Sequence, residues 1–181
     1  MDRTESTVRN LLTAIEAPLY DVGVLSDRGM LPGLDSISAA AVLERLPLLK
    51  HRNAHGSHIY IRPSGEHRFT TLDDLSETSL ARLSADGFNP CAVVETSAGN
   101  FQAWLKHPRI LPKLHGTIAA QTLAERYDAD PSAADWRRLD GFPASRTANL
   151  DTESLTASSL SCACTATVDN STRWRRPSSK R

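Results

Sequence analysis

The sequence predicts an α+β fold with a mainly antiparallel sheet that is flanked by helices. Three observations support this class. Several short runs alternate apolar and polar residues, as half-buried strands do. Residues 97–100 separate two such runs and are typical of a hairpin turn. Other stretches place apolar residues at helical spacing behind a serine cap. The 181 residues are enough for one compact domain with a core.

The first half of the chain contains signals for two helices and three strands. Pro18 ends the first helix, because proline cannot continue one, and Ser36 or Ser38 can cap the second. In chain order we predict a helix over residues 8–17, a strand over 19–25, a helix over 36–46, and strands over 58–62 and 68–72. The last two are predicted to form a hairpin that ends at Asp73 and Asp74.

The second half continues this mixture of helices and strands. Ser76 is a candidate cap for one helix and Gly87 a candidate stop. In chain order we predict a helix over residues 76–84, strands over 92–95 and 101–106, and a longer helix over 112–127. The longer helix is expected to turn four apolar residues toward the core: Leu114, Ile118, Leu123 and Tyr127.

Composition changes near residue 150. Residues 1–150 are predicted to form the folded domain, whereas residues 151–181 are rich in Ser and Thr, end in basic residues and are predicted to form a disordered tail. The formal net charge is zero, which excludes a global basic field for nonspecific duplex binding. Because no apolar stretch suits a membrane span or a signal peptide, we expect no membrane contact and a cytoplasmic location.

Asp73 and Asp74 are candidate ligands for a divalent cation. Mg²⁺ and Mn²⁺ prefer carboxylate oxygens, and two such ions can promote phosphoryl transfer. Successive strand side chains point to opposite faces, so these acids can share a metal only if the strand ends or bends between them. Alternatively, Asp74 helps to cap the next helix and Asp73 is merely exposed. A third carboxylate could come from Asp128, Asp130 or Asp135, although Asp130 also fits a helix cap.

The hairpin of residues 97–106 is a second candidate for ligand binding. Asn100 and Gln102 are two positions apart and share a strand face, where their amides could donate to a phosphate or a base. Trp104 and Lys106 fall on the same face, and an exposed aromatic beside a lysine suits base stacking with phosphate contact. The alternative is an edge strand with a polar outer face and the alternate apolar residues buried behind it.

Four blocks of sequence then occur in the order of one protein family. They are residues 49–63 (LKHRNAHGSHIYIRP), 72–75 (LDDL), 94–104 (VETSAGNFQAW) and 130–138 (DPSAADWRR). Together they resemble RepB-type plasmid primases over residues 19–142, and four blocks in order are far more specific than one. This family belongs to the archaeo-eukaryotic primase superfamily, whose catalytic domain has an RRM-like sheet and makes short primers on single-stranded DNA. Related domains occur in mobilisation proteins.

The resemblance implies a primase-type nucleotidyltransferase that acts in plasmid replication or mobilisation. It implies that Asp73, Asp74 and Asp130 are catalytic and bind Mg²⁺ or Mn²⁺, with Asp135 as the alternative third acid. The implied partners are a single-stranded DNA template, nucleoside triphosphates and a plasmid helicase or mobilisation proteins.

The resemblance also implies nucleotide contacts from two parts of the chain. Ser97, Asn100 and Gln102 match the segment that contacts the incoming nucleotide in the superfamily, and Arg62 and Lys106 are further phosphate-binding candidates. The match is lost after residues 141–146 (GFPASR), where the family continues with further core strands. We therefore expect an incomplete C-terminal end of the core. The alternative function is that of a catalytically inactive remnant that binds single-stranded nucleic acid.

Overall fold

The computed structural model describes residues 3–31, 34–136 and 140–141 of the chain. Its elements in chain order are α1 (Arg3–Ile15), β1 (Tyr20–Ser26), β2 (Gly29–Met30), β3 (Leu34–Ile37), α2 (Ala39–Ala54), β4 (His58–Pro63), β5 (Phe69–Leu75), α3 (Glu77–Ala85), β6 (Ala92–Ser97), β7 (Asn100–Lys106), α4 (Lys113–Tyr127), the 3-10 helix η1 (Pro131–Ala133) and β8 (Asp140–Gly141). Every strand pair within these residues is antiparallel, so the predicted α+β class is confirmed. The tail predicted over residues 151–181 lies outside the described residues.

The strands form two sheets, whereas the sequence led us to expect one. The first sheet has the order β2-β1-β4-β8, with β3 also paired to β1, and the second has the order β5-β7-β6. The predicted hairpin of residues 58–62 and 68–72 is therefore wrong. Strand β4 pairs with β1 on one side and β8 on the other, so β5 pairs with β7 instead. The predicted hairpin of β6 and β7 is confirmed.

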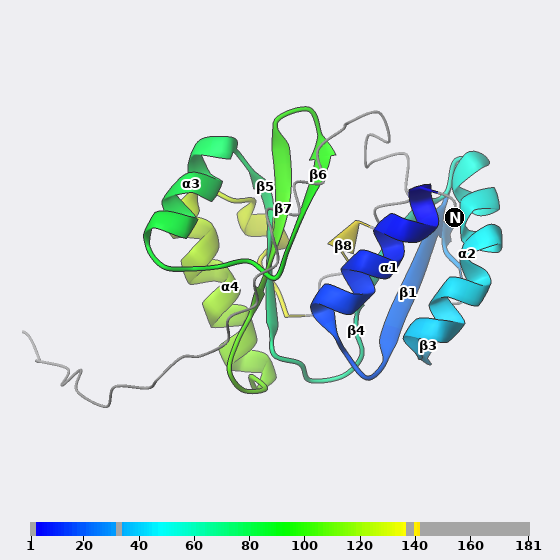
Figure 1. Ribbon diagram of the computed structural model, residues 1–181, viewed down its shortest axis with the longest axis horizontal. Helices are drawn as coiled ribbons and strands as arrows, with labels where there is room; N and C mark the ends of the chain where they lie inside the picture. The colour runs from blue at the N-terminus through cyan, green and yellow to red at the C-terminus, as the bar shows by residue number, and fades with distance from the viewer. Residues whose placement is uncertain (1–2, 32–33, 137–139, 142–181) are drawn as a thin grey trace, which may run out of the picture.

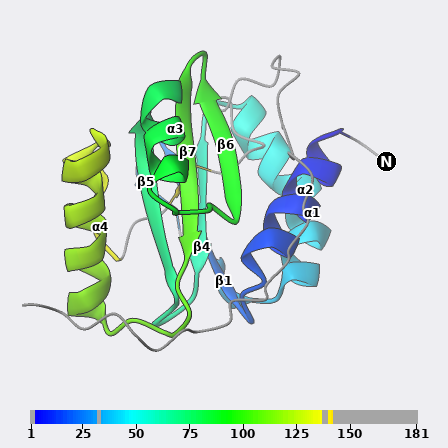
Figure 2. The ribbon, with the colours of Figure 1, turned by 60° about the vertical axis from the view of Figure 1, so that its left-hand side comes forward.

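The helices cover the two sheets from opposite sides. Helices α1 and α2 lie beside the first sheet, and α3 and α4 lie on the outer side of the second (Figures 1 and 2). One apolar cluster joins α1, α2 and the first sheet to a face of the second sheet, with members that include Ile15, Tyr20, Leu49, Ile61 and Trp104. Another cluster packs the opposite face against α3 and α4, with members that include Leu72, Leu83, Ala103, Leu123 and Tyr127. The second sheet is thus buried on both faces.

Helix α2 begins and ends later than predicted. Residues 34–37 form β3, so the cap is Ser38, whose hydroxyl accepts the N–H of Ala41 at 3.2 Å. The helix then continues through Pro47, which lies on its exposed side. A proline removes only one main-chain hydrogen bond of a helix, and the buried face of α2 holds the rest of it against the core. None of the described helices has the length and apolar character that crossing a bilayer requires.

Helix α4 turns a face inward that differs in part from the predicted one. Leu123 and Tyr127 are buried as expected, whereas Leu114 and Ile118 are 69% and 49% exposed. The buried face carries small residues as well, namely Gly116, Ala120 and Ala124. Small side chains let the helix approach its neighbours closely: a Cβ at Gly116 would lie 3.2 Å from Cβ of Trp136. The buried face of α4 is therefore determined more by how closely the helix approaches its neighbours than by the size of its apolar side chains.

Candidate active site

Asp73 and Asp74 lie at a bulge near the end of β5. The pairing of β5 with β7 shifts register between Leu72 and Leu75, so β5 carries an extra residue there. Asp74 adopts a left-handed backbone conformation with φ 61°, and its N–H donates to Oδ1 of Asp73 at 3.1 Å. The strand therefore bends between the two acids, as a shared metal would require. Ser76 caps α3, so the prediction that Asp74 helps to cap it is wrong.

Asp130 lies beside Asp73, although the two are far apart in the sequence. The N–H of Asp130 donates to the main-chain carbonyl of Asp73 at 3.0 Å. The carboxylate of Asp130 caps η1 and accepts the N–H of Ser132 at 2.9 Å and its hydroxyl at 2.8 Å. The predicted cap is confirmed. Because a carboxylate has about four acceptor positions, capping does not occupy them all.

The three acids offer the right donor atoms for a hard cation. Asp73, Asp74 and Asp130 all supply carboxylate oxygens, which Mg²⁺ and Mn²⁺ prefer. In the described part of the chain, however, no three Asp, Glu, His or Cys side chains are grouped so that they could hold a metal ion. Magnesium at phosphate-handling sites is usually held by one or two carboxylates together with water and substrate phosphates. The Asp73–Asp74 pair fits an open site of that kind, with Asp130 adjoining it through the main chain.

Gln102 and Trp104 are buried, so the predicted exposed face of β7 is wrong. Each side chain is only 1% exposed, because the first apolar cluster covers this face of the sheet. Trp104 donates its indole N–H to the Oε1 of Gln102 at 3.3 Å. Gln102 lies opposite the bulge that carries the two acids. A buried Trp104 cannot serve as an exposed platform for base stacking.

The tip of the β6–β7 hairpin lies at the same end of the sheet as the acids. Phe101 pairs with Leu75, which directly follows Asp74. At the tip, the amide of Asn100 donates to the hydroxyl of Ser97 at 3.1 Å. Asn100 is exposed and Ser97 is half-buried. The structure therefore brings these two polar side chains to the edge of the sheet that bears the acids.

Arg62 and Lys106 are both paired with carboxylates. Lys106 donates to Glu16 at 3.0 Å, and this hydrogen bond and the charge of Lys106 lower the pKa of Glu16. Two nitrogens of Arg62 lie 3.1 Å from Oδ2 of Asp21. Burial raises the pKa of Asp21, but hydrogen bonds from Ser36, Ser64 and Arg62 outweigh burial and hold that pKa below its usual range. A nucleotide phosphate would therefore compete with a carboxylate for each of these cations.

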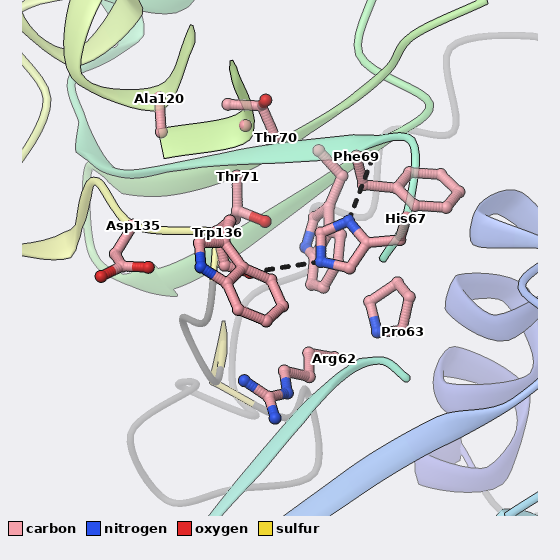
Figure 3. Close-up of a pocket in the computed structure, with 11 residues that line it drawn as sticks. Arg62, Pro63, His67, Phe69, Thr70, Thr71, Ala120, Asp135 and Trp136 are labelled. Atoms are coloured by element: carbon pink, nitrogen blue, oxygen red, sulfur yellow. Dashed lines mark hydrogen bonds between the residues drawn. The ribbon is translucent and has the colours of Figure 1, made fainter. Parts of the chain in front are cut away.

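A pocket lined by parts of β4, β5, β7 and α4 and by the segment after η1 brings together residues that no local sequence pattern groups. Its lining includes Arg62, His67, Thr71, Asp135 and Trp136 (Figure 3). Nδ1 of His67 accepts the N–H of Phe69 at 3.3 Å, so Nε2 carries the proton and donates to the carbonyl of Trp136 at 3.3 Å. Burial lowers the pKa of His67. Asp135, the alternative third acid, lines this pocket, whereas Asp130 contacts the main chain of Asp73.

Comparison with known proteins identifies a family that matches most of the chain. Residues 5–148 match the family described as the RepB DNA-primase N-terminal domain. Mobilization protein A of Escherichia coli is 43% identical over 148 residues, which are 78% of this chain and 21% of that protein. A DNA primase of Acidithiobacillus ferrooxidans is 36% identical over 61 residues, which are 33% of this chain and 17% of that primase. The chain thus spans about a fifth of the length of these curated relatives.

Two crystal structures are similar to the fold. The catalytic domain of primase RepB′, solved in complex with initiator DNA, has a TM-score of 0.74 and 38% sequence identity. That match covers 81% of this chain and 79% of the catalytic domain. A structure of primase RepB′ has a TM-score of 0.71 and 40% identity, covering 77% of this chain and 49% of the primase. The likeness therefore concerns the catalytic part of the primase.

Proposed function

The chain belongs to the RepB DNA-primase N-terminal domain family, and from this premise we propose that it is a primase-type nucleotidyltransferase domain. It makes short primers on a single-stranded DNA template from nucleoside triphosphates. The observation that carries the proposal is the hydrogen bond of 3.0 Å between Asp130 and Asp73, in a chain that resembles a primase catalytic domain. This main-chain bond lies next to the bulge that carries Asp73 and Asp74, and it supports Asp130 as the third acid.

Asp73, Asp74 and Asp130 would hold Mg²⁺ or Mn²⁺ in this proposal. A bound pair of these ions would activate the attacking hydroxyl and stabilise the leaving pyrophosphate. Ser97 and Asn100 bind the incoming nucleotide from the hairpin tip. The remaining polar groups act from nearby: Gln102 supports the nucleotide site from opposite the bulge, and Arg62 and Lys106 leave Asp21 and Glu16 to contact phosphate.

The cellular role is inferred from the relatives. Similarity to a mobilization protein and to primases supports work in plasmid mobilisation or replication. A plasmid helicase or mobilisation proteins are then the partners, and template pairing selects each added base. The chain spans a fifth of Mobilization protein A and about half of primase RepB′. In those relatives, such partners can therefore bind regions that have no counterpart in this chain.

A primer-synthesis assay tests the proposal. The protein is incubated with a single-stranded template, labelled nucleotides and Mg²⁺ or Mn²⁺, and products are separated by size. We expect D73A and D74A to lower synthesis by at least about 100-fold, since each removes a carboxylate that would hold a metal ion at the reacting phosphates. D27A, at an exposed turn outside the site, is the matched control and keeps wild-type activity. Metal-dependent synthesis by D73A would remove that acid from the mechanism.

One observation favours a second function, the binding of single-stranded DNA without primer synthesis. No group of three metal-binding side chains is formed in the described part of the chain. A domain without an assembled metal site would bind single-stranded DNA and make no primer. The same assay, combined with a binding measurement on the labelled template, separates the two functions.

A further inference from the structure

The position of Asp130 relative to Asp73 depends on how α3 and α4 are joined. Asp73 and Asp74 lie shortly before α3, which begins at Glu77 after its N-cap Ser76. Asp130 comes a few residues after the C-terminal end of α4. One acid-bearing segment thus leads into the start of α3, and the other follows the end of α4. A contact that fixes the segment following α4 against α3 therefore also bears on the distance between the acids.

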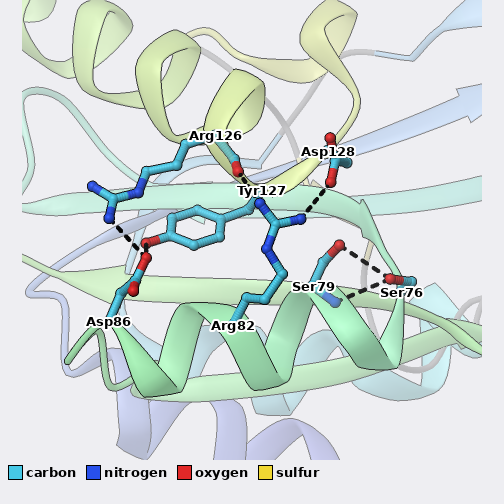
Figure 4. Close-up of polar contacts among 7 residues, drawn as sticks. All are labelled: Ser76, Ser79, Arg82, Asp86, Arg126, Tyr127 and Asp128. Atoms are coloured by element: carbon cyan, nitrogen blue, oxygen red, sulfur yellow. Dashed lines mark hydrogen bonds and ion pairs between the residues drawn. The ribbon is translucent and has the colours of Figure 1, made fainter.

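Arg82 of α3 makes such a contact. One guanidinium nitrogen donates to Oδ2 of Asp128 at 2.6 Å, and the other donates to the main-chain carbonyl of Arg126 at 2.8 Å (Figure 4). The carbonyl is at the C-terminal end of α4, where helix carbonyls lack partners within the helix. The guanidinium also lies 5.9 Å from the ring centre of Tyr127. Arg82 therefore holds three consecutive residues of the last turn.

Asp128 links this contact to Asp130. It is the C-cap of α4 and adopts a left-handed conformation with φ 56°. A left-handed residue is where the chain leaves the helix, so its conformation sets the direction of the segment that leads to Asp130. Ala129 is then anchored by its N–H to the carbonyl of Ala124 at 2.9 Å, and Asp130 reaches Asp73. Arg82 is thus connected to Asp73 by a series of hydrogen bonds that includes Asp128, Ala129 and Asp130.

A neighbouring ion pair in the same network provides an internal comparison. Arg126 pairs with Asp86 at 2.8 Å, and the hydroxyl of Tyr127 donates to Asp86 at 2.8 Å. This pair joins the same two helices. Its carboxylate belongs to Asp86 at the end of α3, so it does not hold the segment between α4 and Asp130. Both pairs are exposed, with side-chain exposures of 50% and 72% for Arg82 and Asp128. Exposed pairs add little to stability, so removing either one should leave the protein folded, and only loss of the Arg82–Asp128 pair should change the site.

We infer that Arg82 is a positioning residue for the metal site: by holding Asp128 and the end of α4, it sets Asp130 against Asp73. This inference rests on the proposed function and assigns no contact between Arg82 and the substrate. Residues that orient metal ligands usually change metal affinity when they are replaced. Arg82 acts one step further away, through the main chain between Asp128 and Asp130.

Binding of Mn²⁺ to the full chain, followed by electron paramagnetic resonance without nucleotide, tests the role of Arg82. We expect R82M to raise the Kd for Mn²⁺ by about tenfold, the low end of the range for residues that orient ligands. Methionine keeps an apolar side chain over Tyr127 and removes every donor. The Mn²⁺ concentration for half-maximal primer synthesis should rise in parallel, while synthesis at saturating Mn²⁺ approaches that of wild type. R126M, the matched control, should keep the wild-type Kd.

D128G separates positioning from stability. Glycine suits the left-handed C-cap conformation, so thermal unfolding of D128G should occur at or above the wild-type temperature. The Kd for Mn²⁺ should nevertheless rise as in R82M, because Arg82 loses its carboxylate partner. Wild-type Mn²⁺ affinity in R82M would overturn the role of Arg82 while leaving the proposed function intact. Absence of Mn²⁺ binding and of primer synthesis in the wild-type protein would overturn both.

Discussion

Asp74 combines a candidate catalytic side chain with an unfavourable backbone conformation. Its φ of 61° lies in the left-handed region, where a side chain with a Cβ atom crowds the following carbonyl. Asp tolerates this region better than most residues, but glycine is the residue that fits without a steric cost. Backbone strain of this kind persists where the surrounding structure holds it and is common at active sites. The bulge of β5 thus places the acid at some expense of stability.

A comparison of D74G with D74A tests this strain. Both variants remove the carboxylate, so both should lose primer synthesis. Only alanine retains the steric cost of the left-handed conformation, so D74G should have a free energy of unfolding about 1 kcal/mol higher than D74A. Urea denaturation followed by circular dichroism measures the difference. Equal stabilities would show that residue 74 does not keep a positive φ in solution.

Prediction from the sequence succeeds best for single residues of the candidate site and their local roles. The sequence indicates Asp73 and Asp74 as candidate ligands because two acids end an apolar run, and the strand bends between them as a shared metal requires. The capping roles of Ser76 and Asp130 are confirmed, since a cap depends on residues only two or three positions away. Whether Asp73, Asp74 and Asp130 bind metal stays a prediction.

At the scale of elements, His67 connects two segments that no local pattern relates. It precedes β5 and donates to the carbonyl of Trp136, which comes after η1. The ring of Trp136 lies 4.8 Å from Nζ of Lys113 at the start of α4. This contact therefore holds the segment after Asp130 against the strand that carries Asp73. His67 is neutral in this arrangement, because Nδ1 accepts the N–H of Phe69 and therefore carries no proton.

The neutral His67 predicts a dependence of stability on pH. Burial is the largest influence and lowers the pKa of His67 in the folded protein, and nearby Arg62 lowers it further. The hydrogen bonds to Trp136 and Phe69 and the charge of Asp21 raise this pKa but do not outweigh burial. The unfolded chain takes up a proton as pH falls below about 6.5, and the folded protein does not, so stability is lost as pH falls through this range. Above about pH 6.5 both states are neutral at this residue and the effect vanishes.

Thermal unfolding between pH 5 and 8 measures this effect. We expect the melting temperature of wild type to fall as pH drops below about 6.5, and to fall less in H67Q. His107, whose pKa burial also lowers, leaves a residual dependence in that variant. H115Q, at an exposed position of α4, should follow wild type. An identical pH profile for H67Q and wild type would contradict the role assigned to His67.

The elements themselves were largely predictable, and their partners were not. Helices and strands depend on spacing, caps and turn residues, and the elements predicted in this way are present with shifted ends, namely α1, β1, α2, β4, β5, α3, β6, β7 and α4. The predicted hairpin between β4 and β5 failed because β4 is paired on both sides by β1 and β8. Strand β8 lies far along the chain from β4, and no local signal connects them.

For the whole molecule, the second sheet is the shared wall of two cores. One of its faces joins the cluster that contains α1, α2 and the first sheet, and the other joins the cluster under α3 and α4. Trp104 belongs to the first cluster and is 1% exposed. It therefore holds the two halves of the molecule together, and its contribution to function is indirect.

W104A distinguishes this role from base stacking. Removing a fully buried tryptophan should lower the free energy of unfolding by about 3–5 kcal/mol, a large part of the total for a domain of this size. Leu114→Ala, at an exposed position of α4, should change it by less than about 0.5 kcal/mol. Urea denaturation measures both. Undiminished stability of W104A together with weaker binding of single-stranded DNA would restore the stacking role.

The sequence by itself determined the local features of this protein: the α+β class, the hairpin at residues 97–100, the caps, and two acids at the end of a strand. These features depend on neighbouring residues and on their period along the chain. The tertiary structure alone decided the division into two sheets, the burial of Gln102 and Trp104, and the contact of Asp130 with Asp73. Each of these results from packing between distant segments, where the burial of apolar surface outweighs local preference.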